Sequence, residues 1–310
     1  MNQNHSTVLI CPGQGAQRAG GVTDLAESFD QLPAAGQQAF RLASEIADCD
    51  LWRLGLSAEQ ADEARLRRPS LLQPFLVAWA VAEHAAVAPR VGPLSYVTGH
   101  SSGINSAMAL SGAISLESAL RFAWQCGKTM DQDCLERPGG LLALVGAGRA
   151  TAEAIADQSG ASLANHNAPD QTVIGGTHES LARAIRVAPE HGGQPVELRV
   201  AGAFHTSSFE QSDALNRRFI DTLEIAEDFT PIVGNHMGQT IESPEQLRDE
   251  LRSQYVRPVE WQSVLRTLYG AGVRRFLTLG PGNVMAGLVR RYGKELPDRI
   301  QIQRTSQLRS

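Results

Sequence analysis

Apolar residues along the chain fall into short runs that end at glycine-containing turns, and into longer segments between them. The short runs predict buried strands over residues 7–10, 94–98 and 276–279. The longer segments predict helices over residues 71–84, 102–110, 115–135 and 284–292. Strands that alternate with helices favour a parallel sheet with helices on both faces. We therefore predict an α/β fold.

The middle of the chain has a different pattern, in which short strands and helices are of similar length. The predicted strands span residues 140–145, 161–165, 171–175 and 195–200, and the predicted helices span residues 151–159 and 178–188. Their order, βαββαβ, is typical of the ferredoxin-like arrangement. A compact unit of this kind inserted into a larger α/β domain creates a cleft at the junction, and such clefts commonly bind ligands.

Composition and charge exclude several classes of protein. The 310 residues are 42% hydrophobic, and the net charge of −5 gives no support for nucleic-acid binding. The cysteines form no C-x-x-C pair and need no disulfide framework, so we expect a reducing, cytoplasmic location. The first residues lack the pattern of a signal peptide, and no stretch approaches about 18 uninterrupted apolar residues, so we expect no membrane span. No metal site is predicted.

Residues 98–105 read T-G-H-S-S-G-I-N and contain the spacing G-x-S-x-G around Ser101. A predicted strand precedes this motif and a predicted helix follows it, which is the context of a nucleophile elbow. A serine hydroxyl becomes an effective nucleophile when a base lies within hydrogen-bond reach and amide donors stabilise the oxyanion. On this segment alone, a glycine-rich loop without chemistry is an equally good interpretation, because short motifs often match by chance.

Three other glycine-containing segments follow predicted strands: P-G-Q-G-A-Q at residues 12–17, G-A-F-H-T-S at 202–207 and G-P-G-N-V at 280–284. With G-H-S-S-G they resemble, in order and spacing, the malonyl-CoA:acyl carrier protein transacylase family, which includes the acyltransferase domains of polyketide synthases. The resemblance extends from about residue 7 to residue 292. It implies a large α/β-hydrolase-like domain with a parallel sheet, over residues 1–137 and 204–310, and an inserted ferredoxin-like subdomain over residues 138–203.

The resemblance implies a catalytic role for four matching residues. Ser101 matches the acylated nucleophile, and His205 matches the base that activates it. The backbone N–H groups of Gln14 and Ser102 match the two donors of the oxyanion hole.

Further matches lie beside the nucleophile and along the expected path of the substrate: His100, Phe204, Asn165 and Asn167. For His100 we expect a structural role, because a residue directly before a nucleophile points away from it. Residues 257–261 match a segment whose backbone carbonyl orients the catalytic histidine. The serine–histidine pair therefore needs no acidic third member, although Glu260 could serve as one.

The chain departs from the family pattern where the acyl group is expected to bind. The family glutamate after the elbow is Ile104 here, followed by Asn105, and the arginine that pairs with a malonyl carboxylate is Cys126. A buried carboxylate without a partner would cost on the order of several kcal/mol. We therefore predict that these residues bind a neutral or aminoacyl group, in a pocket that the small Cys126 and Asn105 side chains make deep enough for a longer chain. Lys128 faces another side of the helix and is a poor substitute for the arginine.

The implied substrate is an acyl thioester on the 4'-phosphopantetheine arm of an acyl carrier protein, or on coenzyme A, and no bound cofactor is implied. Acyl carrier proteins are acidic, so we expect a basic docking patch at the mouth of the cleft. Arg149, Arg290 and Arg291 are the candidates, although each arginine alone is more typical of solvated surface charge. We expect a monomer.

The preferred function is that of a divergent, stand-alone acyltransferase of polyketide biosynthesis. It would move a non-malonyl acyl or aminoacyl group between carrier proteins by a ping-pong mechanism through an acyl-serine. Three alternatives stay open: an editing hydrolase of carrier-protein thioesters, a malonyl-CoA:acyl carrier protein transacylase, and a non-catalytic module that binds carrier proteins. The retained serine, histidine and Gln14 loop argue against the last of these.

Overall fold

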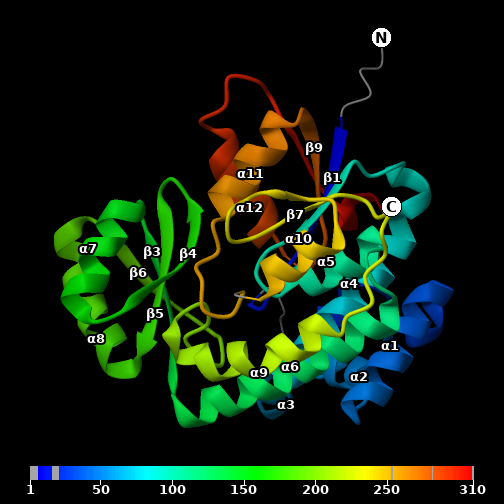
Figure 1. The fold of residues 1–310 in the computed structure, drawn as a ribbon, viewed down its shortest axis with the longest axis horizontal. Helices are drawn as coiled ribbons and strands as arrows, with labels where there is room; N and C mark the ends of the chain where they lie inside the picture. The colour runs from blue at the N-terminus through cyan, green and yellow to red at the C-terminus, as the bar shows by residue number, and fades with distance from the viewer. Residues whose placement is uncertain (1–5, 16–20, 253, 281, 309–310) are drawn as a thin grey trace.

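The computed structural model describes residues 6–15, 21–252, 254–280 and 282–308 (Figure 1). Its larger sheet has six strands in the order β10-β9-β1-β2-β7-β8. Their bounds are β1 Ser6–Cys11, β2 Tyr96–Gly99, β7 Ile232–Val233, β8 Thr240–Ile241, β9 Val273–Thr278 and β10 Gln301–Arg304. Neighbouring strands are parallel except for β7 and β8, so the predicted parallel sheet is confirmed.

Helices cover this sheet on both faces (Figure 1). Their bounds are α1 Ala34–Ala47, α2 Leu51–Leu56, α3 Gln60–Leu66, α4 Pro69–Val91, α5 Gly103–Ser111, α6 Leu116–Glu136, α9 Glu210–Asp221, α10 Pro244–Leu251, α11 Trp261–Gly270 and α12 Val284–Gly293. Side chains of β1 alternate between the two faces, as a strand requires. Leu9 and Cys11 pack in the core with α4, α5 and α6, whereas Val8 and Ile10 pack with α11 and α12.

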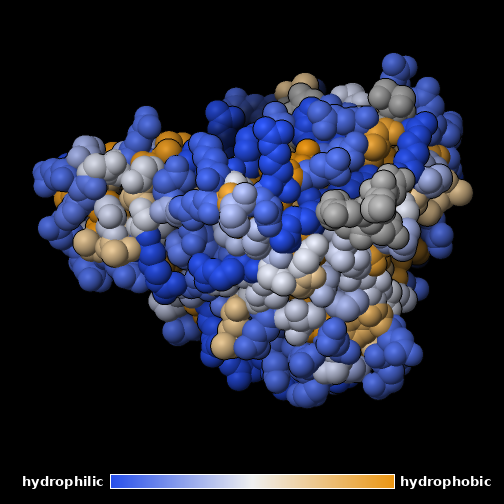
Figure 2. Space-filling model, turned by 90° about the horizontal axis from the view of Figure 1, so that it is seen from above, coloured by the Kyte–Doolittle hydropathy of each residue, from blue (hydrophilic) through white to orange (hydrophobic). Residues whose placement is uncertain are grey.

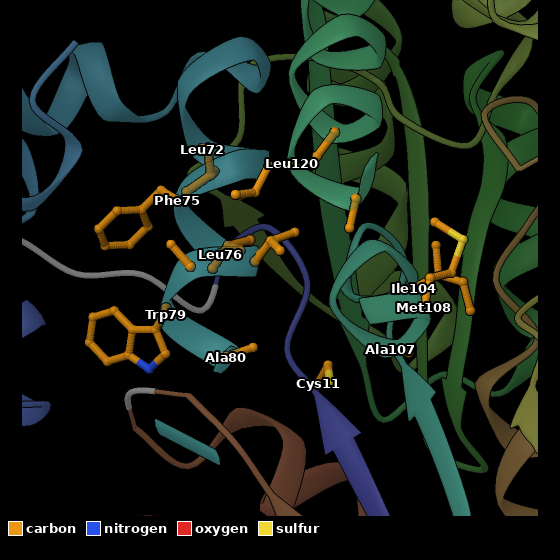
Figure 3. Close-up of a cluster of buried hydrophobic side chains, with 14 of the residues drawn as sticks. Cys11, Leu72, Phe75, Leu76, Trp79, Ala80, Ile104, Ala107, Met108 and Leu120 are labelled. Carbon is orange, nitrogen blue, oxygen red and sulfur yellow. The ribbon is translucent and has the colours of Figure 1, made fainter. Parts of the chain in front are cut away.

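Helix α4 is the central helix of the larger core. By length and composition it could cross a membrane, but most of its apolar stretch is buried inside the protein. Phe75 and Trp79 of α4 are almost fully buried, and the close-up shows them in one cluster with Cys11 of β1 and Ile104 of α5 (Figure 3). Its uniform hydrophobicity is therefore explained by burial among neighbouring helices.

The second sheet has four strands in the order β4-β5-β3-β6, and every neighbouring pair is antiparallel. The strands are β3 Gly139–Val145, β4 Ser162–Ala168, β5 Gln171–Thr177 and β6 Gln194–Leu198, with helices α7 Arg149–Ser159 and α8 His178–Val187 between them. Leu142, Ile155 and Ile174 belong to a separate core between this sheet and its helices. The predicted βαββαβ order is thus present, while the predicted domain boundaries themselves stay a prediction.

The second sheet and its helices form a lobe that projects to one side of the larger sheet (Figures 1 and 2). The chain crosses back against this lobe just before α11. There Val259 donates its N–H to the Ala164 carbonyl (2.9 Å) and accepts from the His166 N–H (2.8 Å). These bonds attach β4 to the larger part of the molecule and fix the position of the cleft between the two sheets.

Candidate active site

The turn between β2 and α5 has the geometry of a nucleophile elbow. Ser101 has a φ of +53°, a left-handed conformation that is unusual for a residue with a side chain. A Cβ at Gly99 would lie 2.0 Å from the carbonyl carbon of Gly103, and one at Gly103 would lie 2.5 Å from the Cys11 carbonyl oxygen. Only glycine fits at these two positions, which explains the spacing of the motif.

Asn235, which follows the short strand β7, holds this turn. Its Oδ1 accepts a hydrogen bond from the Ser101 N–H (3.0 Å), and its own carbonyl accepts from the Glu260 N–H (2.7 Å). The Asn235 N–H donates in turn to a carboxylate oxygen of Glu250 (2.5 Å). The strained backbone of Ser101 is therefore supported by a residue that the sequence patterns did not identify.

The hydroxyl of Ser101 lies 2.6 Å from Nε2 of His205. Nδ1 of His205 lies 3.1 Å from the Arg257 carbonyl oxygen, which can only accept a hydrogen bond. Nδ1 therefore carries the proton, and Nε2 accepts from the Ser101 hydroxyl. Burial, with smaller contributions from the nearby His236 and His100, lowers the pKa of His205 to about 3. The imidazole is neutral near pH 7 and is free to take a proton.

Two candidate oxyanion donors lie next to the elbow. The Gln14 N–H donates to the side-chain oxygen of Ser102 (3.1 Å), so a rotation of that side chain would free it. Ser102 is the N-cap of α5, where backbone N–H groups have no partner within the helix. The segment that contains Gln14 can lie this close to the elbow because residue 13 is glycine. A Cβ at Gly13 would lie 2.3 Å from the His100 carbonyl oxygen.

His100 connects the elbow to the smaller sheet. Its Nε2 donates to Oδ1 of Asn167 on β4 (2.7 Å), and its ring meets that of Trp261 edge to face at 5.1 Å. Burial lowers the pKa of His100, which keeps the ring neutral. These contacts agree with the structural role expected of His100.

A cavity of about 610 Å³ lies between the two sheets and reaches Ser101 and His205. Its walls include Asn165 and Asn167 of β4 and Phe204, three of the residues predicted along the substrate path. Arg67 and Arg199 line it too, but they also line an outer cavity that does not include Ser101, so they lie toward the mouth. The volume is in the range that holds an organic ligand.

A second, much smaller cavity of about 20 Å³ also borders Ser101 and His205. Its lining residues are Gln14, Gln73, Ser101, Ser102, Asn105, Met130, Phe204, His205, Gln254 and Tyr255. Among these described residues there is no lysine or arginine. The cavity is instead lined by four side-chain amides, hydroxyl groups and one neutral imidazole.

The prediction that Cys126 and Ile104 line the acyl pocket stays a prediction. Both side chains are at most 1% exposed, and neither borders the two cavities beside Ser101. The Cys126 thiol is hydrogen-bonded to the hydroxyl of Tyr255, and burial raises the pKa of Cys126 to about 12. Tyr255 itself borders the small cavity, and so does Asn105.

The three predicted docking arginines differ in whether they form ion pairs. Arg149 forms ion pairs with Glu153 (2.9 Å) and Glu260 (2.7 Å). Since Glu260 is bound there, it does not act as a third member behind His205.

Arg291 pairs with Asp170 (2.6 Å), whereas Arg290, at the last turn of α12, is exposed and has no ion pair among the described residues. Lys128 lies over the ring of Trp124 at 3.6 Å and borders neither cavity. Two of the three arginines are therefore already neutralised. No group of residues suited to a metal ion occurs in the described part of the chain.

Sequence and structure comparisons connect this geometry to known proteins. The chain is 34% identical over 289 residues to the polyketide biosynthesis protein ThaF of Burkholderia thailandensis, covering 91% of this chain but 24% of ThaF. The chain thus spans about a quarter of that relative.

Two solved structures are similar over almost their whole length. The malonyl CoA-acyl carrier protein transacylase of Coxiella burnetii has a TM-score of 0.86 at 27% identity, over 98% of this chain and 95% of that chain. The malonyl-transacylase PlMCAT, solved in complex with the type II PKS acyl-carrier protein AntF, has a TM-score of 0.85 at 26% identity, over 96% of this chain and 94% of that chain. The model of the acyl transferase domain matches residues 8–275, and the chain belongs to this family of acyltransferases.

Proposed function

We propose that this acyltransferase moves a neutral acyl group, without a free carboxylate, between acyl carrier protein thioesters through an acyl-Ser101 intermediate. The observation that carries the proposal is the lining of the small cavity beside Ser101, which offers amides and hydroxyl groups and no cation among the described residues. A malonyl carboxylate bound there would lose its water shell without gaining an ion pair, at a cost on the order of several kcal/mol.

The proposed reaction has two steps, acylation of Ser101 and transfer of the acyl group to a second carrier thiol. Ser101 Oγ attacks the thioester carbonyl carbon while its proton passes to Nε2 of His205, 2.6 Å away. The oxyanion that forms is stabilised by the N–H groups of Gln14 and Ser102. The carbon–sulfur bond then breaks, and the leaving thiolate takes the proton from His205. A second carrier thiol gives its proton to His205 and attacks the acyl-serine, which regenerates the Ser101 hydroxyl.

The larger cavity provides a path for the phosphopantetheine arm. It leads from Ser101 between the two sheets, past the amides of Asn165 and Asn167, toward the mouth. The partner would be an acyl carrier protein, as in the complex of PlMCAT with AntF. Arg290 is the best remaining candidate for a contact with an acidic carrier protein, because Arg149 and Arg291 are already paired.

Mass spectrometry of the acylated protein tests this proposal. The chain is mixed with acetyl, propionyl and malonyl carrier-protein thioesters, and the acyl-Ser101 adduct and free acid are followed over time. We expect stable adducts from the neutral thioesters, transfer to a second carrier protein, and no adduct on Ser101→Ala. Rapid release of free acid would indicate a hydrolase instead. Malonyl loading at least as fast as acetyl loading would refute the proposed substrate class, and would show that an arginine such as Arg199 reaches the carboxylate.

A further inference from the structure

Two residues that line the small cavity beside Ser101 each have a buried polar atom without a hydrogen-bond partner among the described residues. Asn105 is only 2% exposed; its Nδ2 donates to Oε1 of Gln73 (3.0 Å), but its Oδ1 has no partner. Nε2 of Gln14 is likewise buried and has no partner. Both residues line the cavity. Buried polar atoms without partners are uncommon and costly, so their occurrence at a reactive serine indicates a ligand.

The orientation of the Asn105 amide follows from its neighbour. Nε2 of Gln73 donates to the thioether sulfur of Met130 (3.0 Å). If the Gln73 amide were turned over, its oxygen would face the sulfur, and two acceptors would meet. Gln73 must therefore present its oxygen to Asn105. Asn105 therefore donates to that oxygen through its NH₂ group. Its own Oδ1, which is a hydrogen-bond acceptor, has no partner among the described residues.

The size of the cavity limits the group that can reach these atoms. Its volume is about 20 Å³. A cavity needs roughly 10–15 Å³ to hold one water molecule. With the acyl carbonyl carbon bonded to Ser101, only one or two further non-hydrogen atoms fit without a rearrangement of Tyr255 or Gln254.

The group that fits must donate a hydrogen bond to Asn105 Oδ1 and, with the Gln14 amide oriented as in this structure, accept one from Gln14 Nε2. A hydroxyl group does both. A methyl group does neither, an ammonium group only donates and brings a charge without a counterion, and a carboxylate only accepts. We propose that this cavity selects a short hydroxyacyl group, of which hydroxyacetyl is the smallest, and that Asn105 and Gln14 bind its hydroxyl. This inference rests on the proposed transfer of neutral acyl groups.

A matched pair of substrates tests the inference. Hydroxyacetyl and propionyl thioesters have the same number of non-hydrogen atoms and differ only by a hydroxyl in place of a methyl group. We expect kcat/KM for acylation of Ser101 to be at least about tenfold higher for hydroxyacetyl, because propionyl leaves both amide atoms unpaired. Asn105→Leu removes the acceptor and should abolish this preference, mainly by raising the propionyl rate.

Asn216→Leu is the matched control, since Asn216 is a fully buried asparagine on α9 that borders neither cavity, and its Nδ2 also lacks a partner among the described residues. This control should keep the preference. Thermal melting identifies variants that do not fold. If Asn105→Leu does not fold, the ratio of kcat/KM for hydroxyacetyl to that for propionyl in wild type decides whether the inference holds. Equal rates for the two substrates, or a preference that survives in Asn105→Leu, would overturn the inference and leave the proposed function intact. Loading of malonyl but of neither neutral thioester would overturn both.

Discussion

The low pKa of His205 predicts how stability depends on pH. Burial lowers this pKa from 6.5 to about 3 in the folded protein. Between these values the unfolded chain binds a proton that the folded chain does not bind, so stability is lost as the pH falls through this window and is fully present above it. At pH 5 the loss from this one group is about 2 kcal/mol, because pH 5 lies 1.5 units below 6.5 and each unit contributes about 1.36 kcal/mol.

The substitution His205→Gln isolates this contribution. Glutamine has no charge at any pH, so the variant should not suffer the loss. Urea unfolding of wild type and variant at pH 7 and pH 5 gives the two changes in the free energy of unfolding. Wild type should lose about 2 kcal/mol more than the variant. The pKa values of His84 and His100 are also lowered by burial, but both residues are present in both proteins and cancel.

The same pKa predicts a flat pH profile for acylation. With a pKa of about 3, about 99% of the His205 side chains are neutral at pH 5, whereas a pKa of 6.5 would leave about 3% neutral. The rate of acyl-Ser101 formation should therefore stay nearly constant from pH 7.5 to pH 5. A rate that falls with an apparent pKa near 6.5, together with equal acid sensitivity of wild type and His205→Gln, would refute the reasoning.

Four further substitutions test other parts of the site. Arg290→Glu should raise KM for a carrier-bound acyl group and leave turnover of a small pantetheine thioester unchanged, whereas Arg291→Glu should have a smaller effect; equal KM values for both variants and wild type would exclude this face of α12 as the docking surface. Cys126→Arg should lower the free energy of unfolding by about 1–3 kcal/mol, because the Cys126 side chain is fully buried and hydrogen-bonded to Tyr255, and should not produce efficient malonyl loading; a stable variant that loads malonyl would contradict this. Asn235→Ala should leave the N–H of the nucleophile unpaired, cost about 1–3 kcal/mol in urea unfolding and slow acylation at unchanged substrate KM; wild-type kinetics would show that Asn235 does not position the nucleophile.

Much of the fold could be predicted because it depends on local patterns. Short sequence segments were enough to predict the strand at residues 7–10 and the turn at the elbow glycines. The same is true of the βαββαβ order around the smaller sheet. Strand β7, Ile232–Val233, was not predicted, since two residues are too short to show a period. Asn235 follows this strand, so the residue that supports the turn at Ser101 was missed together with it.

The lining of the cavities beside Ser101 is harder to predict, because it depends on contacts between segments far apart in the sequence. The sequence shows that position 126 has a cysteine where the family pattern has an arginine. This difference predicted that the acyl pocket has no cation. The sequence did not show that the Cys126 thiol is hydrogen-bonded to Tyr255, a residue from a different segment that borders the small cavity. Close packing in protein interiors means that a substitution in one segment is usually compensated by another. The size of a pocket therefore cannot be read from a single position.

The segment at residues 254–257 connects the two functions of the site. The carbonyl oxygens of Tyr255 and Arg257 accept hydrogen bonds from the backbone N–H and the Nδ1 of His205, and so fix the position and the tautomer of the base. The side chains of Gln254 and Tyr255 border the small cavity beside Ser101, the proposed site of the acyl group. In the proposed mechanism the base is held by backbone atoms and the acyl group by side chains, so substitutions in this segment can change the size and polarity of the pocket while the imidazole keeps its orientation. A backbone carbonyl as the partner of the histidine, where other serine enzymes use a carboxylate, thus allows substrate choice to vary without loss of the base.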